Sequence, residues 1–274
     1  MAASGWRPSK VNLAALLDPL GRACREAGEA IRAIRRRGFA VERKGDLSPV
    51  TEADRAAEAI LLAALARHAP GVPVVAEEEV AAGRIPDLGD TFFLVDPLDG
   101  TREFVQGGDD YTVNIGLVVA GTPVVGLVLA PEQGALWAGV VGDTAWVESD
   151  DGERRPLAVR MPGERLTVVA SKSHMNQATR EFLAAELPDA ELVSVGSSLK
   201  FCLLAQGTAD YYPRLSPTSE WDTAAGHAVL LAAGGQVDAQ DGLPLGYGKP
   251  GFLNAGFSAT AGWKGPRLAS YMKV

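Results

Sequence analysis

Apolar residues recur at helical spacing along the first part of the chain. This spacing predicts one helix over residues 11–37 and a second over residues 52–68, with a loop at residues 44–48 between them. One face of the second helix is apolar and consists of Ala56, Ile60, Leu61, Ala64 and Leu65. The chain is therefore expected to begin with two helices.

Short apolar runs then replace the helical pattern. They predict strands over residues 72–76, 91–95, 111–119, 124–130, 135–141 and 144–147. Tight turns are predicted at Gly121-Thr122-Pro123 and at Gly142-Asp143. Because short connections of this kind join antiparallel neighbours, a mostly antiparallel sheet is expected.

The pattern changes again after the polar stretch 148–155. Strands are predicted over residues 166–170, 192–195 and 209–212, and they alternate with helices over residues 177–186, 198–205 and 222–233. Such alternation is typical of an α/β lobe. The sequence thus predicts an α+β N-terminal lobe with an antiparallel sheet, residues 1–155, and an α/β C-terminal lobe, residues 156–274.

Composition and charge narrow the class of protein. A chain of 274 residues with 47% hydrophobic and 22% charged residues can bury a large core. The apolar runs are too short to span a membrane, and residues 1–7 lack the apolar run of a signal peptide, so we expect a cytoplasmic protein. A net charge of -8 disfavours binding to a nucleic-acid polymer. Cys24 and Cys202 are too few for a disulfide framework.

The most informative motif places two carboxylates directly after the apolar run 92–95. It reads Asp96-Pro97-Leu98-Asp99-Gly100-Thr101. A strand is expected to deliver these side chains at its carboxyl end, which is a usual place for a site in an α/β sheet. Pro97 restrains the backbone between the aspartates, and Gly100 lets the next turn bring its N–H groups close to a ligand. The combination suits hard cations and a phosphate.

Two further acidic segments could supply oxygen ligands to the same site. They are the triplet 77–79, which is Glu77-Glu78-Glu79, and Asp222 at the head of an Ala-rich helix. Mg²⁺ prefers oxygen ligands, so a set of Glu77, Asp96, Asp99, Asp222 and the Leu98 carbonyl has suitable chemistry. Each fragment alone has a simpler interpretation: an Asp-Gly turn, a solvated glutamate face or a helix cap. Their conjunction favours the metal site.

These motifs together resemble those of the inositol monophosphatase superfamily of Mg²⁺-dependent, lithium-sensitive phosphatases. The resemblance covers residues 44–257 and includes Ser48-Pro49-Val50-Thr51-Glu52-Ala53-Asp54, Ala76-Glu77-Glu78 and Trp221-Asp222-Thr223-Ala224-Ala225-Gly226. Segments outside the metal motif are most similar to bacterial 3′(2′),5′-bisphosphate nucleotidases; these segments are residues 171–174, 196–203, 212–214 and 252–254. The resemblance implies a layered α-β-α-β-α sandwich, typical of sugar phosphatases, with the site where the lobes meet.

The resemblance also implies roles for individual residues. Glu77, Asp96 and the Leu98 carbonyl would hold one Mg²⁺, and Asp96, Asp99 and Asp222 a second. Asp54 and Thr101 would orient or deprotonate the attacking water, and Glu78 would hold a water or a third ion. The N–H groups of Gly100 and Thr101 would cradle the phosphate. Further substrate contacts are expected from Lys44, Ser173, His174, Ser197, Lys200 and Arg214.

Several of these substrate contacts have alternatives. Lys44 could be a solvated loop residue, and His174 a turn residue without a ligand. Lys200 stands in an apolar segment, so its ammonium must reach outward or find an anion. Glu220 beside Asp222 either adds negative charge near the second metal or points away from it.

Three functions remain open from the sequence. The leading hypothesis is hydrolysis of the 3′-phosphate of adenosine 3′,5′-bisphosphate, with its sulfated form as a further substrate, by two or three Mg²⁺ ions and with inhibition by Li⁺. The second is an inositol monophosphatase or a fructose-1,6-bisphosphatase-type sugar phosphatase. The third is a catalytically silent metal- or nucleotide-binding regulator. In each case the partner is a small phosphorylated molecule rather than a membrane or nucleic acid, and a homodimer is an option for assembly.

Overall fold

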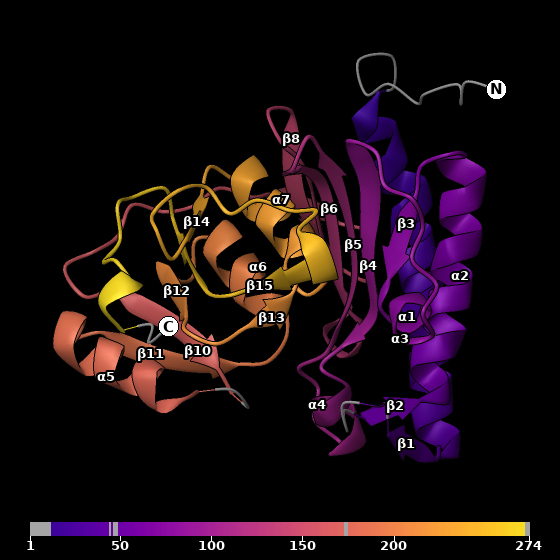
Figure 1. Ribbon diagram of the computed structural model, residues 1–274, viewed down its shortest axis with the longest axis horizontal. Helices are drawn as coiled ribbons and strands as arrows, with labels where there is room; N and C mark the ends of the chain where they lie inside the picture. The colour runs from indigo at the N-terminus through magenta and orange to yellow at the C-terminus, as the bar shows by residue number, and fades with distance from the viewer. Residues whose placement is uncertain (1–11, 44, 46–48, 173–174, 272–274) are drawn as a thin grey trace.

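Five layers, α-β-α-β-α, make up the molecule (Figure 1). The computed structural model describes residues 12–43, 45, 49–172 and 175–271. Lys44, Ser173 and His174, three of the predicted substrate contacts, lie outside the described residues. The layered mixed α/β architecture confirms the predicted fold class.

Two long helices form the first layer. α1, Leu17–Arg37, follows the 3₁₀ turn η2, Leu13–Leu16, so the predicted helix over residues 11–37 begins later as an α-helix than expected. α2, Glu52–His68, has its predicted bounds. The two helices cover one face of the large sheet, where a continuous core includes Leu20, Ile31, Leu61, Phe93 and Ile115.

The second layer is a seven-stranded sheet in chain order. Its strands are β3 (Val74–Ala76), β4 (Thr91–Asp99), β5 (Thr112–Val119), β6 (Thr122–Ala130), β7 (Ala135–Val140), β8 (Thr144–Glu148) and β9 (Arg154–Pro156). All neighbours pair antiparallel except β3 and β4, which confirms the predicted pairing. The prediction ended β4 at residue 95, but the ladder with β5 continues, after an irregularity, to Asp99 opposite Thr112. The carboxylates that were expected just after the strand are therefore part of it.

A row of glycines sets how closely the third layer approaches this sheet. Gly116, Gly126 and Gly139 stand side by side in the registers of β5, β6 and β7. α7, Ala224–Ala232, lies directly over them. A Cβ at Gly126 would lie 2.1 Å from the backbone oxygen of Ala225. Only glycine permits this approach, and α7 begins just after Asp222, so the row also fixes one edge of the site.

The remaining layers belong to the C-terminal part of the chain. A five-stranded sheet has the order β11 (Glu191–Val195), β10 (Thr167–Ser171), β12 (Tyr211–Arg214), β16 (Phe257–Thr260) and β14 (Gln236–Ala239). α6, Leu199–Ala205, lies with α7 between the two sheets, and α5, Gln177–Glu186, covers the outer face (Figure 1). The strand predicted over residues 209–212 lies two residues later as β12. The division into lobes at residue 155 stays a prediction.

Several short elements escaped prediction. They are β1 (Val41–Arg43), β2 (Pro49–Thr51), α3 (Glu77–Ala81), α4 (Thr101–Val105), β9, β13 (Thr218–Ser219), β14, β15 (Leu253–Asn254), β16 and the 3₁₀ turns η3 (Pro131–Gln133), η4 (Pro250–Phe252) and η5 (Ala269–Tyr271). Most span two to five residues, too short for a periodic pattern to develop.

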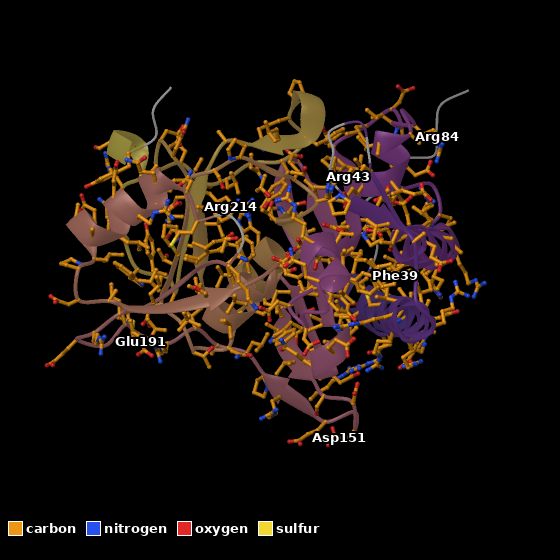
Figure 2. The ribbon with its side chains drawn as sticks, turned by 90° about the horizontal axis from the view of Figure 1, so that it is seen from below. Phe39, Arg43, Arg84, Asp151, Glu191 and Arg214 are labelled. Carbon is orange, nitrogen blue, oxygen red and sulfur yellow. The ribbon has the colours of Figure 1, made fainter. Side chains whose placement is uncertain are left out.

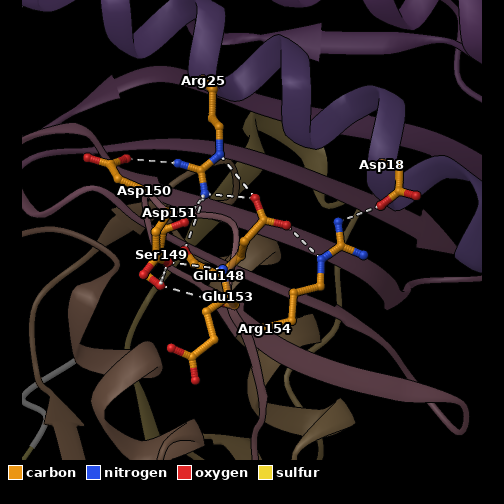
Figure 3. Close-up of polar contacts among 8 residues, drawn as sticks. All are labelled: Asp18, Arg25, Glu148, Ser149, Asp150, Asp151, Glu153 and Arg154. Carbon is orange, nitrogen blue, oxygen red and sulfur yellow. Dashed lines mark hydrogen bonds and ion pairs between the residues drawn. The ribbon is translucent and has the colours of Figure 1, made fainter.

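A network of charged side chains fastens α1 to the β8–β9 hairpin, far along the chain (Figure 3). Arg25 of α1 lies 2.8 Å from Glu148, whose other oxygen is 2.6 Å from Arg154. Arg154 also reaches Asp18 at 2.6 Å, and Arg25 reaches Asp150 at 3.1 Å. The network stabilises the outer end of the sheet.

Candidate active site

The predicted site residues converge on a cleft of about 370 Å³ between the two sheets. Both parts of the chain line it, and the predicted residues among its lining are Glu77, Asp96, Leu98, Asp99, Gly100, Thr101, Ser197, Lys200, Arg214 and Asp222. Figure 2 shows Arg214 toward the middle of the molecule, whereas Arg84 and Asp151 lie at its periphery. One cleft therefore contains most of the residues that the sequence predicted for the site, from segments more than a hundred residues apart.

The direction of Asp96 follows from strand alternation. Phe93 and Val95 of β4 pack into the core beneath α1 and α2, whereas Phe92 and Leu94 face the opposite side. Asp96 continues the second set and so points toward the C-terminal layers. Its side chain is 2% exposed, and its Oδ1 accepts a hydrogen bond of 3.0 Å from the Leu98 amide. The strand thus holds a carboxylate inside the cleft.

Gly100 allows the chain to turn at the end of β4. Its φ is +96°, a left-handed value that favours glycine. A Cβ there would lie 2.5 Å from Ser197 Oγ and 2.9 Å from the Asp110 carbonyl oxygen. The Ser197 hydroxyl is 2.7 Å from the Asp99 carbonyl oxygen and 3.0 Å from that of Asp110. Ser197 therefore fastens this turn, and its contact with a substrate stays a prediction.

The carboxylates of the cleft act strongly on one another. Burial raises the pKa of Asp96 well above its usual value, and the charges of Glu77, Asp99 and Asp222 raise it further. Burial, followed by the charge of Asp222, raises the pKa of Asp99 to about 6, although the charge of Lys200 opposes the rise. Close carboxylates in a buried place are costly unless a cation is present.

The chemistry of these donors fits a hard divalent cation, because all of them are oxygen atoms. Within the residues that the structure describes, however, no group of three or more His, Cys, Asp or Glu side chains is arranged to hold a metal ion as it stands. Asp222 accepts hydrogen bonds from the Thr218 hydroxyl and, at 3.2 Å, from the Ser219 amide. The ligand roles of these residues remain predictions.

Asp54 and Thr101 meet as the sequence predicted. The Thr101 hydroxyl lies 3.1 Å from Asp54 Oδ1 and also 3.1 Å from the Leu98 carbonyl oxygen. Asp54 is fully buried in the first turn of α2, where its Oδ2 accepts 2.8 Å hydrogen bonds from the amide and hydroxyl of Thr51. Both neighbours of the Thr101 hydroxyl are acceptors, so they compete for its single proton. The lone pairs of the hydroxyl oxygen can therefore accept a hydrogen bond from a donor such as water.

Glu78 lies apart from these residues. It lines a neighbouring hollow formed by α2, α3 and the β1–β2 pair, and it is absent from the lining of the cleft. Its backbone amide donates to Glu58 Oε2 at 2.9 Å. Glu77 borders both spaces. A direct contact of Glu78 with the cleft is therefore not part of this arrangement.

Two cations face the carboxylates from the C-terminal side. Lys200 is 2% exposed, and its Nζ donates to the carbonyl oxygens of Ser197 at 2.5 Å and Val195 at 3.2 Å. Burial lowers the pKa of Lys200 to about 8, against the charge of Asp99. Its ammonium therefore turns inward, and the alternative of reaching outward to solvent is wrong.

Arg214 is the second cation, and its guanidinium is held by neighbouring oxygens. It donates to the carbonyl oxygens of Ser216 and Pro217 at 3.3 Å and to the Tyr212 hydroxyl at 3.4 Å. Burial acts to lower the pKa of Arg214, but Tyr212 and, to a smaller extent, the charges of Asp222 and Asp99 raise it, and the net shift is upward. A cation fixed in this way is available for a phosphate of a substrate.

Glu220 does not add charge to the cleft. Its carboxylate is fully buried and accepts hydrogen bonds from the amides of Gly248 at 2.8 Å and Lys249 at 3.1 Å. The ammonium of Lys249 lies 2.6 Å from it. Of the two alternatives for Glu220, the one in which it points away from the metal motif is correct.

Sequence reasoning missed two polar residues under the cleft, Asn114 and Ser198. Asn114 Nδ2 donates to Ser198 Oγ at 3.1 Å, and Ser198 Oγ lies 3.2 Å from Asp99 Oδ2. A signal existed for Asn114, since it is a lone amide between Val113 and Ile115 in an apolar strand. Ser198 lies in the segment 196–203, which carries part of the resemblance, but no role was predicted for it.

Comparison with known proteins finds relatives along most of the chain. The model of the inositol monophosphatase family matches residues 13–267. The 3′(2′),5′-bisphosphate nucleotidase CysQ of Salmonella typhimurium is 42% identical over 248 residues, which cover 89% of this chain and 99% of that protein. The crystal structure of CysQ from Bacteroides thetaiotaomicron has a TM-score of 0.78 at 35% identity, covering 92% of this chain and 99% of that one. An inositol monophosphatase from Anabaena has a TM-score of 0.73 at 28% identity, covering 92% of each chain.

The layered α-β-α-β-α fold and the family match together define the chain as a phosphatase. The chain belongs to the inositol monophosphatase family. Within the described part of the chain, no helix has both the length and the apolarity that crossing a membrane requires.

Proposed function

We propose that this chain is a Mg²⁺-dependent phosphomonoesterase that removes the 3′-phosphate of adenosine 3′,5′-bisphosphate. The observation that carries the proposal is the division of charge in the cleft. Glu77, Asp96, Asp99 and the Thr101–Asp54 pair lie on the N-terminal wall, whereas both Lys200 and Arg214 lie on the C-terminal wall, together with Asp222. A bisphosphate needs one place for the phosphate that reacts and another for the phosphate that stays. The name of the Salmonella typhimurium relative, a 3′(2′),5′-bisphosphate nucleotidase, supports a nucleotide bisphosphate as the substrate.

The acidic side chains of the cleft would bind the metal ions that hydrolysis needs. Glu77, Asp96 and the Leu98 carbonyl would hold one Mg²⁺, and Asp96, Asp99 and Asp222 would hold a second. When bound, these ions activate a water for in-line attack on phosphorus and stabilise the charge of the departing oxygen. The reaction consumes one water, breaks the phosphorus–oxygen ester bond, and gives an alcohol and inorganic phosphate.

The Thr101–Asp54 pair takes part through a proton. Because the Thr101 hydroxyl donates toward Asp54 or the Leu98 carbonyl, its oxygen is free to accept a hydrogen bond from the attacking water. That contact orients the water and draws its proton toward the buried carboxylate of Asp54. The Gly100 and Thr101 amides would bind the phosphate oxygens at the turn that Gly100 permits.

Lys200 and Arg214 are assigned to the phosphate that stays. Arginine binds phosphate in a bidentate manner, and a buried lysine adds a second positive charge where water is scarce. An inositol monophosphate has no second phosphate to use these cations. The alternative of an inositol monophosphatase is supported by the Anabaena structure and would leave the pair without a ligand. Fructose 1,6-bisphosphate has a second phosphate that could bind the pair, so the assay below separates it from the nucleotide.

The first test is phosphate release with Mg²⁺ from adenosine 3′,5′-bisphosphate, inositol 1-phosphate and fructose 1,6-bisphosphate. The highest kcat/KM is expected for the nucleotide. Arg214→Ala should lower kcat/KM for the nucleotide by about 10- to 100-fold, because a charged hydrogen bond to phosphate contributes roughly 1.5–3 kcal/mol, while inositol 1-phosphate is little affected. Arg67→Ala, at an exposed position on α2, is the matched control. Equal losses on both substrates would remove Arg214 from recognition.

Further parts of the proposal have tests of their own. They are hydrolysis of the sulfated nucleotide, inhibition by Li⁺, a third ion near Glu78, location in the cytoplasm, assembly as a homodimer and a lobe boundary at residue 155. Activity assays test hydrolysis of the sulfated nucleotide and inhibition by Li⁺, and metal titration tests the third ion. Cell fractionation tests the location, light scattering tests the homodimer, and limited proteolysis tests the lobe boundary.

A further inference from the structure

A buried chain of hydrogen bonds runs beneath the cleft from one wall to the other. It starts at Asn114 on β5, which is fully buried, and passes from Nδ2 to Ser198 Oγ over 3.1 Å. Ser198 directly precedes α6 and is 2% exposed. Its Oγ lies 2.7 Å from the Asp222 carbonyl oxygen and 3.2 Å from Asp99 Oδ2. One hydroxyl therefore contacts two segments that carry predicted metal ligands.

The sheet register explains why Asn114 can reach this place. Asn114 stands opposite Asp96 in the β4–β5 ladder, so both side chains point to the same face. Its neighbours Val113 and Ile115 belong to the core on the other face. Asn114 is thus a polar side chain at a position of the strand that faces the C-terminal layers, next to the carboxylate of Asp96.

A contribution to folding stability does not explain the amide side chain of Asn114. Within the described residues Asn114 Oδ1 is buried and has no hydrogen-bond partner. A buried polar group without a partner costs roughly 1–3 kcal/mol, and an apolar side chain of similar shape avoids that cost. A residue that is unfavourable for folding at such a position is typical of a functional site.

The direction of the hydrogen bonds gives Asn114 its effect. A hydroxyl has one proton, and Ser198 uses a lone pair to accept from Asn114. Its single proton is then shared between two acceptors, the Asp222 carbonyl oxygen at 2.7 Å and Asp99 Oδ2 at 3.2 Å. Without the amide the hydroxyl could rotate, and the link between these two segments would weaken.

We propose that Asn114 is a positioning residue that acts through Ser198 to fix the Asp99 carboxylate relative to the start of α7 at Asp222. This inference rests on the proposed function for its metal ligands, but not on the identity of the substrate. The Asn114–Ser198 pair would set the distance between Asp99 and Asp222, two of the residues that would hold the second Mg²⁺. Partners of this kind, one step removed from the metal, typically change metal affinity by 10- to 100-fold.

The experiment compares Mg²⁺ binding by titration calorimetry in the whole protein, without substrate. Asn114→Leu keeps the approximate volume, and Ser198→Ala removes the hydroxyl. Each variant should bind the second Mg²⁺, the one that Asp99 and Asp222 would hold, with about 10- to 100-fold lower affinity. The double variant should bind Mg²⁺ as well as the weaker-binding single variant does, since both changes remove the same link. Ser198→Thr retains the hydroxyl and should restore binding.

Thermal unfolding of the metal-free protein separates positioning from folding. Asn114→Leu should leave the Tm unchanged or higher, because it removes an unsatisfied amide. Thr260→Val is the matched control: Thr260 is 2% exposed, its Oγ1 likewise has no partner within the described residues, and it stands on β16. Thr260→Val should not change Mg²⁺ affinity.

The outcomes are distinct. Normal Mg²⁺ affinity in both single variants, or losses that add in the double variant, would overturn the proposal. If Asn114→Leu fails to fold, Ser198→Ala and Ser198→Thr decide. A wild-type protein that binds Mg²⁺ but does not hydrolyse the nucleotide would overturn the proposed function and leave this inference standing.

Discussion

The two walls of the cleft are built in different ways. On the N-terminal wall Asp96, Leu98, Asp99, Gly100 and Thr101 come from six consecutive residues at the end of one strand. Part of their geometry is set by near neighbours, such as the Leu98 amide on Asp96 and the Thr101 hydroxyl on the Leu98 carbonyl, and Ser197 and Ser198 hold Asp99 from the other wall. This wall is largely a property of one short segment.

The C-terminal wall has no such segment. Ser197 and Lys200 flank the start of α6, Arg214 ends β12, and Asp222 precedes α7. Packing brings them together, above all the glycine row under α7. The contrast suggests that single substitutions on the first wall change chemistry, whereas those beneath the second wall change its position.

The largest effect is expected from Asp96→Asn on the first wall. Loss of the carboxylate that would bridge both metals should reduce kcat/KM by about 1,000-fold, or roughly 4 kcal/mol. The metal-free protein should fold at least as well, because the substitution removes a buried charge that is repelled by Glu77 and Asp99. Activity assays and thermal unfolding would check both, with exposed Asp189→Asn as control. Near-normal turnover would refute the metal assignment.

Gly126→Ala is expected to damage the second wall through packing. Its Cβ would meet the Ala225 carbonyl oxygen at 2.1 Å, so α7 must move. Overpacking of this kind costs up to roughly 3 kcal/mol of stability, and kcat/KM should fall because Asp222 moves with the helix. Denaturation would measure the loss. Gly89→Ala, where a Cβ meets nothing within 4 Å, should be neutral; a neutral Gly126→Ala would contradict the role of the glycine row.

The same contrast explains what the sequence could predict. The motif at 96–101 specified residue types, spacing and turn chemistry, and the structure has these residues in one cleft. The sequence did not predict the link from Asn114 to Ser198, because it joins segments that are far apart in the chain. The inward turn of Lys200 was one of two alternatives, and the nearby carbonyl oxygens of Val195 and Ser197 decide it. Strands β14 and β16 also escaped, since four-residue strands between loops have little pattern of their own.

A smaller, pH-dependent effect is expected beneath the second wall at His227 of α7. Burial lowers the pKa of His227 to about 3, and its Nδ1 lies 3.0 Å from the Tyr247 hydroxyl. The unfolded chain therefore binds a proton below about pH 6.5 that the folded protein does not. Stability should fall by up to about 1.4 kcal/mol per pH unit as the pH decreases from there.

Urea unfolding at pH 7.5 and pH 5.0 would test this. Wild type should lose roughly 2 kcal/mol more than His227→Gln between the two conditions. His68→Gln, at the exposed end of α2, should behave as wild type. If His227→Gln is as acid-sensitive as wild type, the proton uptake belongs to other groups.

The smallest effect is expected outside both walls, in the network of Figure 3. Arg25→Met removes contacts with Glu148 and Asp150, which are partly or well exposed, so the loss should be about 1 kcal/mol or less and should shrink at high salt. Arg22→Met, at an exposed position of α1, is the control. Mg²⁺ affinity and kcat/KM should not change in either variant, because neither side chain lines the cleft. A change in Mg²⁺ affinity with Arg25→Met would mean that the first wall depends on the whole sheet rather than on its own segment.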